Sequence, residues 1–517
     1  MNEAWGEGYF TDIAYTYGYY REVSPLFQRF CLLLRGQAAM VPDNGPDAWH
    51  CELGYGQGVS VNIHAAANPG RFMGTDFNPA HAAHANQLAQ AAGSGALLYD
   101  DSFEQFLARR DLPQFDSISL HGVWSWVSLA NRNIITQLAR RHLKPGGVMY
   151  VSYNSMPGWS PANPLRHLFV THDRYGTASG NAVERVESAL EFSESLLAAR
   201  PNYLQTAPHL VEHLKSIATQ NRHYLAHEYF NQDWRCMYFT EVVDALTAAK
   251  LDFACTAVPQ DAIDTINLSE PAQQFLDGLG HPVLREQVRD YFVNKQFRKD
   301  LFVRGRFALL PGQQREQMLD SRLVLTTAPD LVPMTIQGAQ GEGRLQETHY
   351  RPFLDILAEQ HHAPKTLRTI AARMPQTSWP ILRQIVTVLT GMGAIAPCQS
   401  DEAQAQVRDR CRKLNSHLFD LARHRNDILT LASPVLGGGV AMGRFDQLFL
   451  HAREEGLSDP DQWAAATWTL LDEQDQRIMK DGKKLETPEE NLAELQQQAR
   501  DFNEVRLPIC KSLGIAD

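Results

Sequence analysis

The sequence predicts an α/β fold in which a parallel β-sheet is covered by helices and followed by mainly helical domains. Three observations carry this prediction. Short apolar runs alternate with helical patterns between residues 48 and 153, the alternation then stops, and helical periodicity dominates residues 350–397 and 401–517. The chain has 517 residues, which is long enough for two to four domains that each bury a core of their own.

The sheet is expected to begin with a series of strands joined by helices. The apolar runs that predict strands are residues 48–53, 71–76, 96–99, 117–121 and 148–153. The helical patterns between them are residues 59–67, 80–92, 103–109 and 131–141. This alternation is typical of parallel strands connected by helices that lie on the faces of the sheet. Lys144-Pro145-Gly146-Gly147 predicts a tight turn before the fifth strand, because proline fixes φ and glycine accepts a positive φ.

After residue 153 a helical insertion is expected to interrupt the sheet. The elements expected after the interruption point are helices at 182–199, 207–221 and 239–249, and strands at 251–259 and 296–304. Arg298, Lys299, Arg304 and Arg306 form a local basic patch, which we interpret as a solvated strand edge. Helical patterns at 350–360, 366–374 and 378–391, with an apolar segment at 394–397, predict a winged-helix-like module. In the helical tail, Thr487 and Glu490 predict a capping box.

Composition excludes several classes of protein. The chain carries 48 basic and 59 acidic side chains, so its net charge of −11 disfavours nucleic acid as a partner. The last helix of the winged-helix-like module offers only Arg383 as a cation, which favours protein contact or dimerisation there. The seven cysteines show no metal-binding spacing, so no metal is expected. We expect them to be buried, reduced thiols in a cytoplasmic protein. Neither a signal peptide nor an apolar stretch long enough for membrane insertion is recognisable.

A glycine-rich turn follows the first strand and precedes a helix, in Glu52-Leu53-Gly54-Tyr55-Gly56-Gln57-Gly58. Such glycines let the backbone turn sharply and approach a ligand, although a turn of this kind is also used for packing alone. The dinucleotide fingerprint would need glycine where Val59 stands. S-adenosylmethionine explains both this departure and Glu52, because it has no pyrophosphate and its ammonium and sulfonium favour a nearby carboxylate.

Acidic residues also end the next two strands, where ligands of open α/β sheets bind. Asp76, followed by Phe77, is placed to accept hydrogen bonds from ribose hydroxyls. In Asp100-Asp101-Ser102-Phe103, one carboxylate is expected to accept from the adenine amino group while Phe103 packs on the ring. Taken singly each aspartate would be read as a helix cap, but as a set with the glycines they predict a cofactor site.

Five passages together resemble bacterial methyltransferases that carry a methyltransferase regulatory domain, whose relatives include rickettsial protein-lysine methyltransferases acting on outer-membrane protein. The passages are residues 15–25, the glycine turn, residues 76–79, His121-Gly122-Val123-Trp124-Ser125-Trp126-Val127, and Tyr153-Asn154 with Pro157-Gly158-Trp159. The likeness covers residues 9–170 most closely and extends to about residue 306. Tyr55 departs from the pattern, since a small residue is commoner at that position.

The resemblance implies a class I, Rossmann-like seven-stranded sheet with a helical insertion and accessory domains. The expected domains are 1–163 for the adenosylmethionine-binding core with an N-terminal lid, 164–228 for a helical dimerisation or regulatory insertion, 229–306 for the rest of the sheet, 307–400 for the winged-helix-like middle domain and 401–517 for the helical C-terminal domain. A protein or peptide substrate and a homodimer are implied in the same way.

The methyl acceptor is predicted mainly by exclusion. Methyl transfer is an in-line displacement, so the enzyme has chiefly to align a nucleophile and shield it from water. Candidate pocket residues are His121, Trp124, Trp126, Tyr153, Asn154 and Trp159, each of which has packing as its alternative role. His121 also belongs to the expected cofactor site. The Asn/Asp-Pro-Pro-aromatic motif of enzymes that methylate amide or base nitrogens is absent. Adenine, cytosine-amine and glutamine-amide acceptors are therefore not expected. The family resemblance implies protein lysine as the first hypothesis; a small-molecule or peptide methyltransferase and a non-catalytic adenosylmethionine sensor are the alternatives.

An aromatic N-terminal segment precedes the first strand. Its members are Tyr9, Phe10, Tyr15, Tyr17, Tyr19 and Tyr20. The segment is expected either to close the cofactor site as a lid, with Tyr15, Tyr17 and Tyr20 over the ligand, or to form an aromatic helix packed on the sheet.

Overall fold

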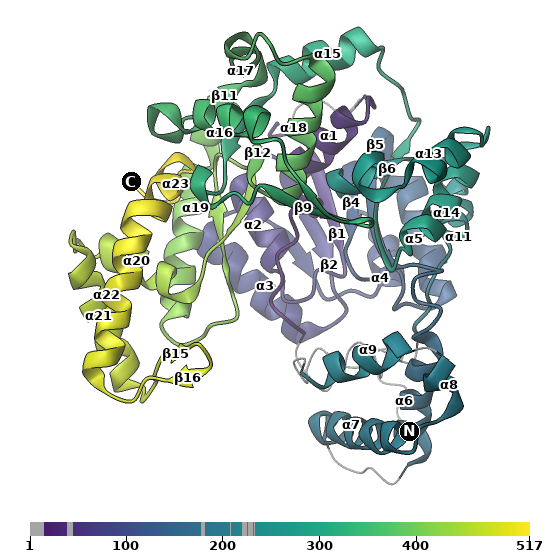
Figure 1. Cartoon of the computed structure of the whole chain (residues 1–517), viewed down its shortest axis with the longest axis horizontal. Coiled ribbons are helices and arrows are strands. Elements are labelled where there is room, and N and C mark those ends of the chain that lie inside the picture. The colour runs from purple at the N-terminus through teal and green to yellow at the C-terminus, as the bar shows by residue number, and fades with distance from the viewer. Residues whose placement is uncertain are drawn as a thin grey trace.

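A mixed seven-stranded sheet forms the centre of the computed structural model, which describes residues 15–38, 45–176, 181–206, 208–219, 225, 231 and 233–517. The strand order is β3-β2-β1-β4-β5-β7-β6 (Figure 1). The strands are β1 (Trp49–Leu53), β2 (Arg71–Thr75), β3 (Leu97–Tyr99), β4 (Phe115–Leu120), β5 (Leu143–Asn154), β6 (Leu251–Thr256) and β7 (Phe297–Arg304). β1 to β5 are parallel, and β7 runs antiparallel between β5 and β6. The predicted α/β fold, with its seven-stranded sheet, is confirmed.

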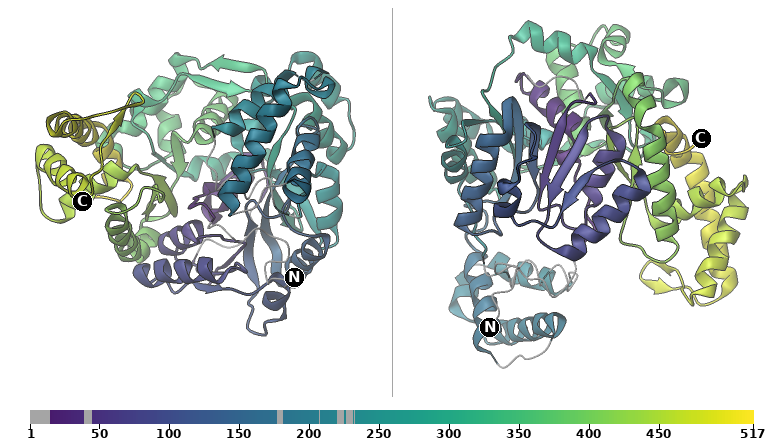
Figure 2. Two further views of the ribbon diagram at one scale, coloured as in Figure 1. Left: turned by 90° about the horizontal axis from the view of Figure 1, so that it is seen from below. Right: turned by 180° about the vertical axis from the view of Figure 1, so that it is seen from behind.

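Helices that join the parallel strands cover the sheet, as Figure 2 shows from behind. They are α2 (Val59–Ala67), α3 (Pro79–Ala92), α4 (Phe103–Ala108) and α5 (Leu129–His142), and η1 (Arg21–Val23) and α1 (Pro25–Leu34) precede them. The Asn78 side chain accepts from Ala80 N–H at the start of α3, and Gly93 ends that helix with φ +62°. These four helices match the predicted ones to within two residues at each end.

The fifth strand begins five residues earlier than predicted. Leu143 already pairs with Phe115, and the register then shifts before Ser117 pairs with Val148. Gly146 has φ +78° inside this irregularity, so the expected turn is a local distortion within β5 rather than a loop before it.

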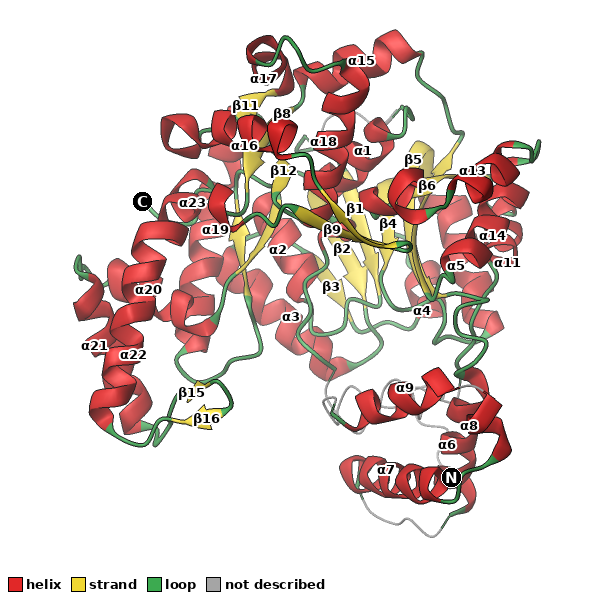
Figure 3. Ribbon diagram, in the orientation of Figure 1, coloured by secondary structure: helices red, strands yellow, loops and turns green. Residues whose placement is uncertain are grey.

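The insertion after β5 is helical, as predicted, and projects from one end of the sheet (Figure 3). Its described helices are α6 (Asn163–Tyr175), α7 (Ala182–Ala198), α8 (Asn202–Thr206) and α9 (Pro208–Ala218). They share a core of their own, in which Leu165, Phe169, Leu190 and Leu214 are buried. The chain then returns through α11 (Phe239–Thr247) to β6, and η2 (Pro259–Ala262), α12 (Asp264–Asn267), α13 (Glu270–Asp277) and α14 (Pro282–Val293) connect β6 to β7.

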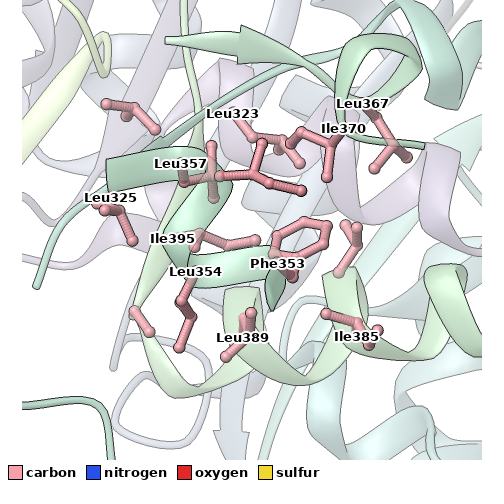
Figure 4. Packing of buried hydrophobic residues seen from close by; sticks show 14 of the residues in the cluster. Leu323, Leu325, Phe353, Leu354, Leu357, Leu367, Ile370, Ile385, Leu389 and Ile395 are labelled. Carbon is pink, nitrogen blue, oxygen red and sulfur yellow. The ribbon is translucent and has the colours of Figure 1, made fainter. Parts of the chain in front are cut away.

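The region expected to be winged-helix-like combines a small sheet with three helices. The sheet has the order β11 (Lys365–Thr366), β8 (Arg322–Leu325), β12 (Ile395–Pro397), and the helices are α16 (Glu347–His362), α17 (Leu367–Arg373) and α18 (Trp379–Met392). Figure 4 shows its apolar core, where Phe353 and Leu357 of α16 meet Ile385 and Leu389 of α18. The remaining elements here are α15 (Pro311–Asp320), η3 (Pro329–Leu331), β9 (Thr335–Gly338) and β10 (Gly341–Arg344).

The tail is mainly helical but also contains two hairpins that the sequence did not predict. The helices are α19 (Asp401–Ala422), α20 (Arg444–Glu454), α21 (Pro460–Glu473), α22 (Pro488–Asp501), η4 (Phe502–Arg506) and α23 (Leu507–Ser512). The hairpins are β13 (Thr430–Ser433) with β14 (Gly438–Ala441), and β15 (Met479–Lys480) with β16 (Lys483–Lys484). Thr487 caps α22 in the predicted capping box. The tail shares one apolar core with α2 and α3, which fixes it against the sheet domain.

The interpretation of the basic patch as a solvated strand edge is wrong for Arg298. β7 is an internal strand, and the Arg298 side chain is only 3% exposed. Its guanidinium forms ion pairs with Asp290 at 2.6 Å, Asp300 at 2.7 Å and Glu286 at 2.8 Å. Because these partners lie on α14 and on β7 itself, the cation belongs to a buried network. All seven cysteines are buried. No described helix combines the length and apolar character needed to cross a bilayer.

Candidate functional site

A pocket lies at the carboxyl ends of the parallel strands. This position is where open α/β sheets bind their ligands. The pocket is lined by nine of the residues predicted for the cofactor site and lid, namely Tyr15, Gly54, Gly56, Asp76, Phe77, Asp101, Ser102, Phe103 and His121. Segments that are far apart in sequence thus meet at this edge of the sheet.

The three glycines of the turn after β1 differ in role. All have left-handed φ, at +66°, +56° and +75° for Gly54, Gly56 and Gly58. Gly54 and Gly56 line the pocket, whereas Gly58 precedes α2 and packs on α3, where an added Cβ would lie 2.3 Å from the Ala85 Cβ. Gly58 therefore serves close packing, and the first two glycines bring backbone to the pocket.

Tyr55 is accommodated beneath the turn. Its hydroxyl donates to the backbone oxygen of Tyr99 at 2.6 Å. The ring lies against Gly74, where an added Cβ would be only 3.0 Å from it. Packing between β1 and β2 thus accommodates the tyrosine at position 55, where a small residue is commoner.

Glu52 ends β1 as a buried carboxylate without a counter-charge. Its residue is 6% exposed, and no described side chain forms an ion pair with it or donates to it. Burial raises the pKa of Glu52 to about 8. A buried carboxylate of this kind favours a cationic group from a ligand.

Asp76 links the turn to the start of α3. Its Oδ2 accepts from Gly56 N–H at 2.8 Å, and its Oδ1 accepts from Asn78 N–H at 3.1 Å. His81 Nδ1 lies 3.0 Å from the same Oδ1, and His81 also lines the pocket. The sequence did not predict His81, although its place one turn into α3 was a usable signal.

Asp101 and Asp100 are distinguished by the geometry. Asp101 lines the pocket and pairs with Arg109 at 3.0 Å, while Asp100 is exposed and does not line it. Ser102 caps α4 by accepting from Gln105 N–H, which orients the turn. Phe103, the first residue of α4, completes this end of the pocket.

His121 forms the opposite wall. Its Nδ1 lies 2.8 Å from the Tyr150 hydroxyl, and its ring stacks on Tyr20 with 3.6 Å between centroids. Burial, aided by the nearby Lys299 charge, lowers the pKa of His121 to about 3, so the imidazole is neutral at physiological pH.

Several predicted acceptor-site residues lie outside the pocket. Trp124 and Tyr153 are fully buried in the core of the sheet, and the Tyr153 hydroxyl donates to Asp300 at 2.7 Å. Asn154 is also buried, and Trp159 packs edge-on against Trp234. None of these four lines the pocket, whereas Trp126 does. Val123, Val127, Ser128, Asn131 and Asp233 line it as well and were not predicted.

The described part of the aromatic segment is an extended strap of residues 15–20 rather than a helix. Tyr15 lines the pocket, with its ring 3.2 Å from the position that a Cβ on Gly56 would take, and Tyr20 covers His121. Tyr17 instead stacks under Arg425 at 4.1 Å, so it faces the C-terminal domain. Tyr9 and Phe10 lie outside the described residues.

Among the described residues, no group of three or more His, Cys, Asp or Glu side chains is arranged to hold a metal ion. The pocket residues are chiefly aromatic side chains, carboxylates and glycine backbone. Such a lining suits an organic ligand that carries both an aromatic ring and positive charge.

Comparison with known families gives two matches. Residues 51–151 match the family described as "Methyltransferase domain", and residues 221–304 match "Predicted methyltransferase regulatory domain". The first match covers β1 to β5 up to Val151, which includes every strand that contributes to the pocket.

Two relatives and one solved structure extend this likeness. An uncharacterised protein of Synechocystis is 38% identical over 517 residues, covering 99% of this chain and all of the relative. An uncharacterised protein of Rickettsia prowazekii is 25% identical over 292 residues, which cover 54% of this chain and 50% of that protein. PKMT2 from Rickettsia typhi, solved in complex with AdoHcy, has a TM-score of 0.70 at 16% identity and covers 97% of this chain and all of its own.

Proposed function

Because the chain belongs to the class I S-adenosylmethionine-dependent methyltransferases that carry a methyltransferase regulatory domain, we propose that it transfers methyl groups to lysine side chains of a protein substrate. One observation carries the cofactor part of the proposal, namely the buried carboxylate of Glu52, which has no described cation beside it and lies two residues before Gly54 of the pocket lining. The full-length likeness to PKMT2 from Rickettsia typhi supports the choice of a protein acceptor.

The residues present fit S-adenosylmethionine. Glu52 offers a carboxylate to its ammonium, and Asp76 Oδ2 retains a lone pair for a ribose hydroxyl because it accepts only from Gly56 N–H in the described chain. Asp101 offers a carboxylate to the adenine amino group, and Phe103 offers a ring face. When bound, S-adenosylmethionine supplies an activated methyl group attached to a sulfonium.

The acceptor side of the pocket is built from aromatic rings. Tyr15 and Trp126 line it, and Tyr20 backs His121. Ring faces attract an alkyl-ammonium through cation–π contact, and the low polarity around them favours loss of its proton. These residues align the lysine nitrogen and exclude water, which is what an in-line displacement requires.

The proposal is tested with radiolabelled S-adenosylmethionine, a cell lysate and the purified full chain. Label is expected in acid-precipitable protein and, after hydrolysis, in methyl-lysine. Asp76→Ala protein, which loses the ribose contact and the Gly56 hydrogen bond, is the negative control. Label only in the acid-soluble fraction would contradict a protein acceptor. Cofactor binding by calorimetry without any transfer would instead support a sensor.

A further inference from the structure

We propose that Tyr150 holds His121 in its Nε2–H tautomer, so that the imidazole donates a hydrogen bond to the ligand and does not act as the base. His121 Nδ1 lies 2.8 Å from the Tyr150 hydroxyl. A neutral imidazole carries one N–H and one bare nitrogen, so the direction of this single contact decides which nitrogen faces the pocket as a donor.

The partners of the Tyr150 hydroxyl set the direction of this hydrogen bond. Tyr150 is fully buried, and His121 Nδ1 is the one group of the described chain in hydrogen-bonding geometry with its hydroxyl. If the hydroxyl donates to Nδ1, its buried hydrogen has an acceptor, and Nε2 carries the proton of the neutral imidazole.

The opposite direction leaves a buried donor unsatisfied. If Nδ1–H donated to the Tyr150 oxygen, the hydrogen of the Tyr150 hydroxyl would need another acceptor, and no other described group is in hydrogen-bonding geometry with it. A buried hydroxyl without an acceptor costs stability, so the first arrangement prevails.

The free nitrogen faces the candidate pocket. His121 Nε2 bonds to no described residue, and the ring is held by its stack on Tyr20. β1 and β4 are neighbouring strands in which Glu52 pairs with Ser119, so His121 lies two residues beyond the partner of Glu52. Resting on the proposed function, we assign Glu52 to the ammonium and His121 Nε2–H to the carboxylate of the amino-acid part of S-adenosylmethionine.

Tyr150 does not line the pocket, so it is a positioning residue whose effect passes through His121. The tautomer is read from long-range ¹H–¹⁵N spectra of protein labelled at histidine, with the His121 signals assigned through His121→Gln. The wild-type protein is expected to show a protonated Nε2 and a bare Nδ1 without any ligand, and the Tyr150→Phe protein a mixture of tautomers. A protonated Nδ1 in the wild-type protein would overturn the proposal.

Calorimetry with two ligands tests the role of the donor separately. His121→Leu is expected to weaken S-adenosylhomocysteine binding about tenfold, while His121→Gln, which keeps an N–H donor, restores most of it. Neither His121 substitution should change the binding of 5′-methylthioadenosine, which lacks the amino-acid part. Tyr153→Phe, the removal of another buried hydroxyl that does not line the pocket, is the matched control for Tyr150→Phe and should leave both affinities unchanged.

The outcomes separate the two proposals. If wild-type protein binds neither ligand, the proposed function fails while the spectra still report the tautomer. If S-adenosylhomocysteine binds but His121→Leu leaves its affinity unchanged, the proposed function stands and the role of His121 is refuted.

Discussion

The hydroxyl oxygen of Tyr19 accepts a hydrogen bond from the backbone N–H of Gly439, at 2.7 Å and across 420 positions of sequence. This contact ties the strap that bears Tyr15 and Tyr20 to the β13–β14 hairpin of the tail. Arg21 makes a second tie, since its guanidinium donates to Thr390 O at 3.0 Å and Gly391 O at 2.7 Å on α18. Two domains that contribute no side chain to the pocket thereby hold one of its walls.

Arg21→Ala is expected to weaken S-adenosylhomocysteine binding about fivefold, although Arg21 does not line the pocket. The strap would lose its anchor on α18, so part of the free energy of ligand binding would be used to order the strap. Calorimetry measures the change, with Arg306→Ala, which removes an exposed arginine away from the strap, as the control. Equal affinities for the wild-type and Arg21→Ala proteins would mean that α18 does not hold the strap in place.

Glu52→Gln is expected to stabilise the ligand-free protein and to weaken its ligand binding. The pKa of Glu52 is about 8 in the folded state, above the ordinary value of about 4.3, so the folded state binds an extra proton between these pH values. Stability therefore falls as pH rises through this window and is level above it. Glutamine does not titrate, so the variant does not lose this stability. We expect its free energy of unfolding to exceed that of the wild type by a few kcal/mol at pH 8 and by a negligible amount below pH 4.

Urea unfolding at pH 5 and pH 8 measures the stability part of this prediction. The gain of Glu52→Gln over wild type should be larger at pH 8. Affinity for S-adenosylhomocysteine at pH 8 should fall about tenfold, since the buried carboxylate that pairs with its ammonium is gone. A variant that lost stability at pH 8 would show that Glu52 has a counter-charge in the folded protein.

Gly58→Ala should destabilise the protein more than Gly93→Ala does. Both glycines have left-handed φ, at +75° and +62°, so both substitutions incur backbone strain of about 1 kcal/mol. At Gly93 an added Cβ meets nothing within 4 Å, whereas at Gly58 it lies 2.3 Å from the Ala85 Cβ. Overpacking adds roughly 1–3 kcal/mol at Gly58, which denaturant unfolding of both variants measures. Equal losses would refute the close contact of α2 with α3.

Asp101→Asn is expected to lower affinity for S-adenosylhomocysteine about tenfold, and Asp100→Asn to leave it within about twofold. The two side chains are neighbours in sequence, but only Asp101 lines the pocket. Parallel calorimetric titrations provide the measurement. A larger effect at Asp100 would place the adenine on the other side of α4.

Local pattern was enough to predict the parallel strands and their helices, because apolar alternation and caps such as Asn78 and Thr487 act within a few residues. Local pattern also places Asp76 and the Asp100-Asp101 pair directly after β2 and β3, but it left open which of the two neighbouring aspartates reaches the pocket. The early start of β5 could not be predicted, since it depends on the pairing of Leu143 with Phe115.

The directions of the side chains could not be predicted from the sequence either. Gly122 turns the chain with φ +64°, and beyond it Trp124 points into the core while Trp126 reaches the pocket. Arg298 was misjudged because its buried partner Asp290 arrives on a helix, which sequence spacing does not reveal. The domain boundaries, the homodimer and the lysine acceptor stay predictions.

The tie between Tyr19 and Gly439 also has a consequence during protein synthesis. The strap leaves the ribosome before its partner in β14, which is translated 420 positions later. A chain that ended before β14 would carry the whole seven-stranded sheet without this anchor for its strap. Anchoring of this pocket wall therefore has to wait until β14 has been translated.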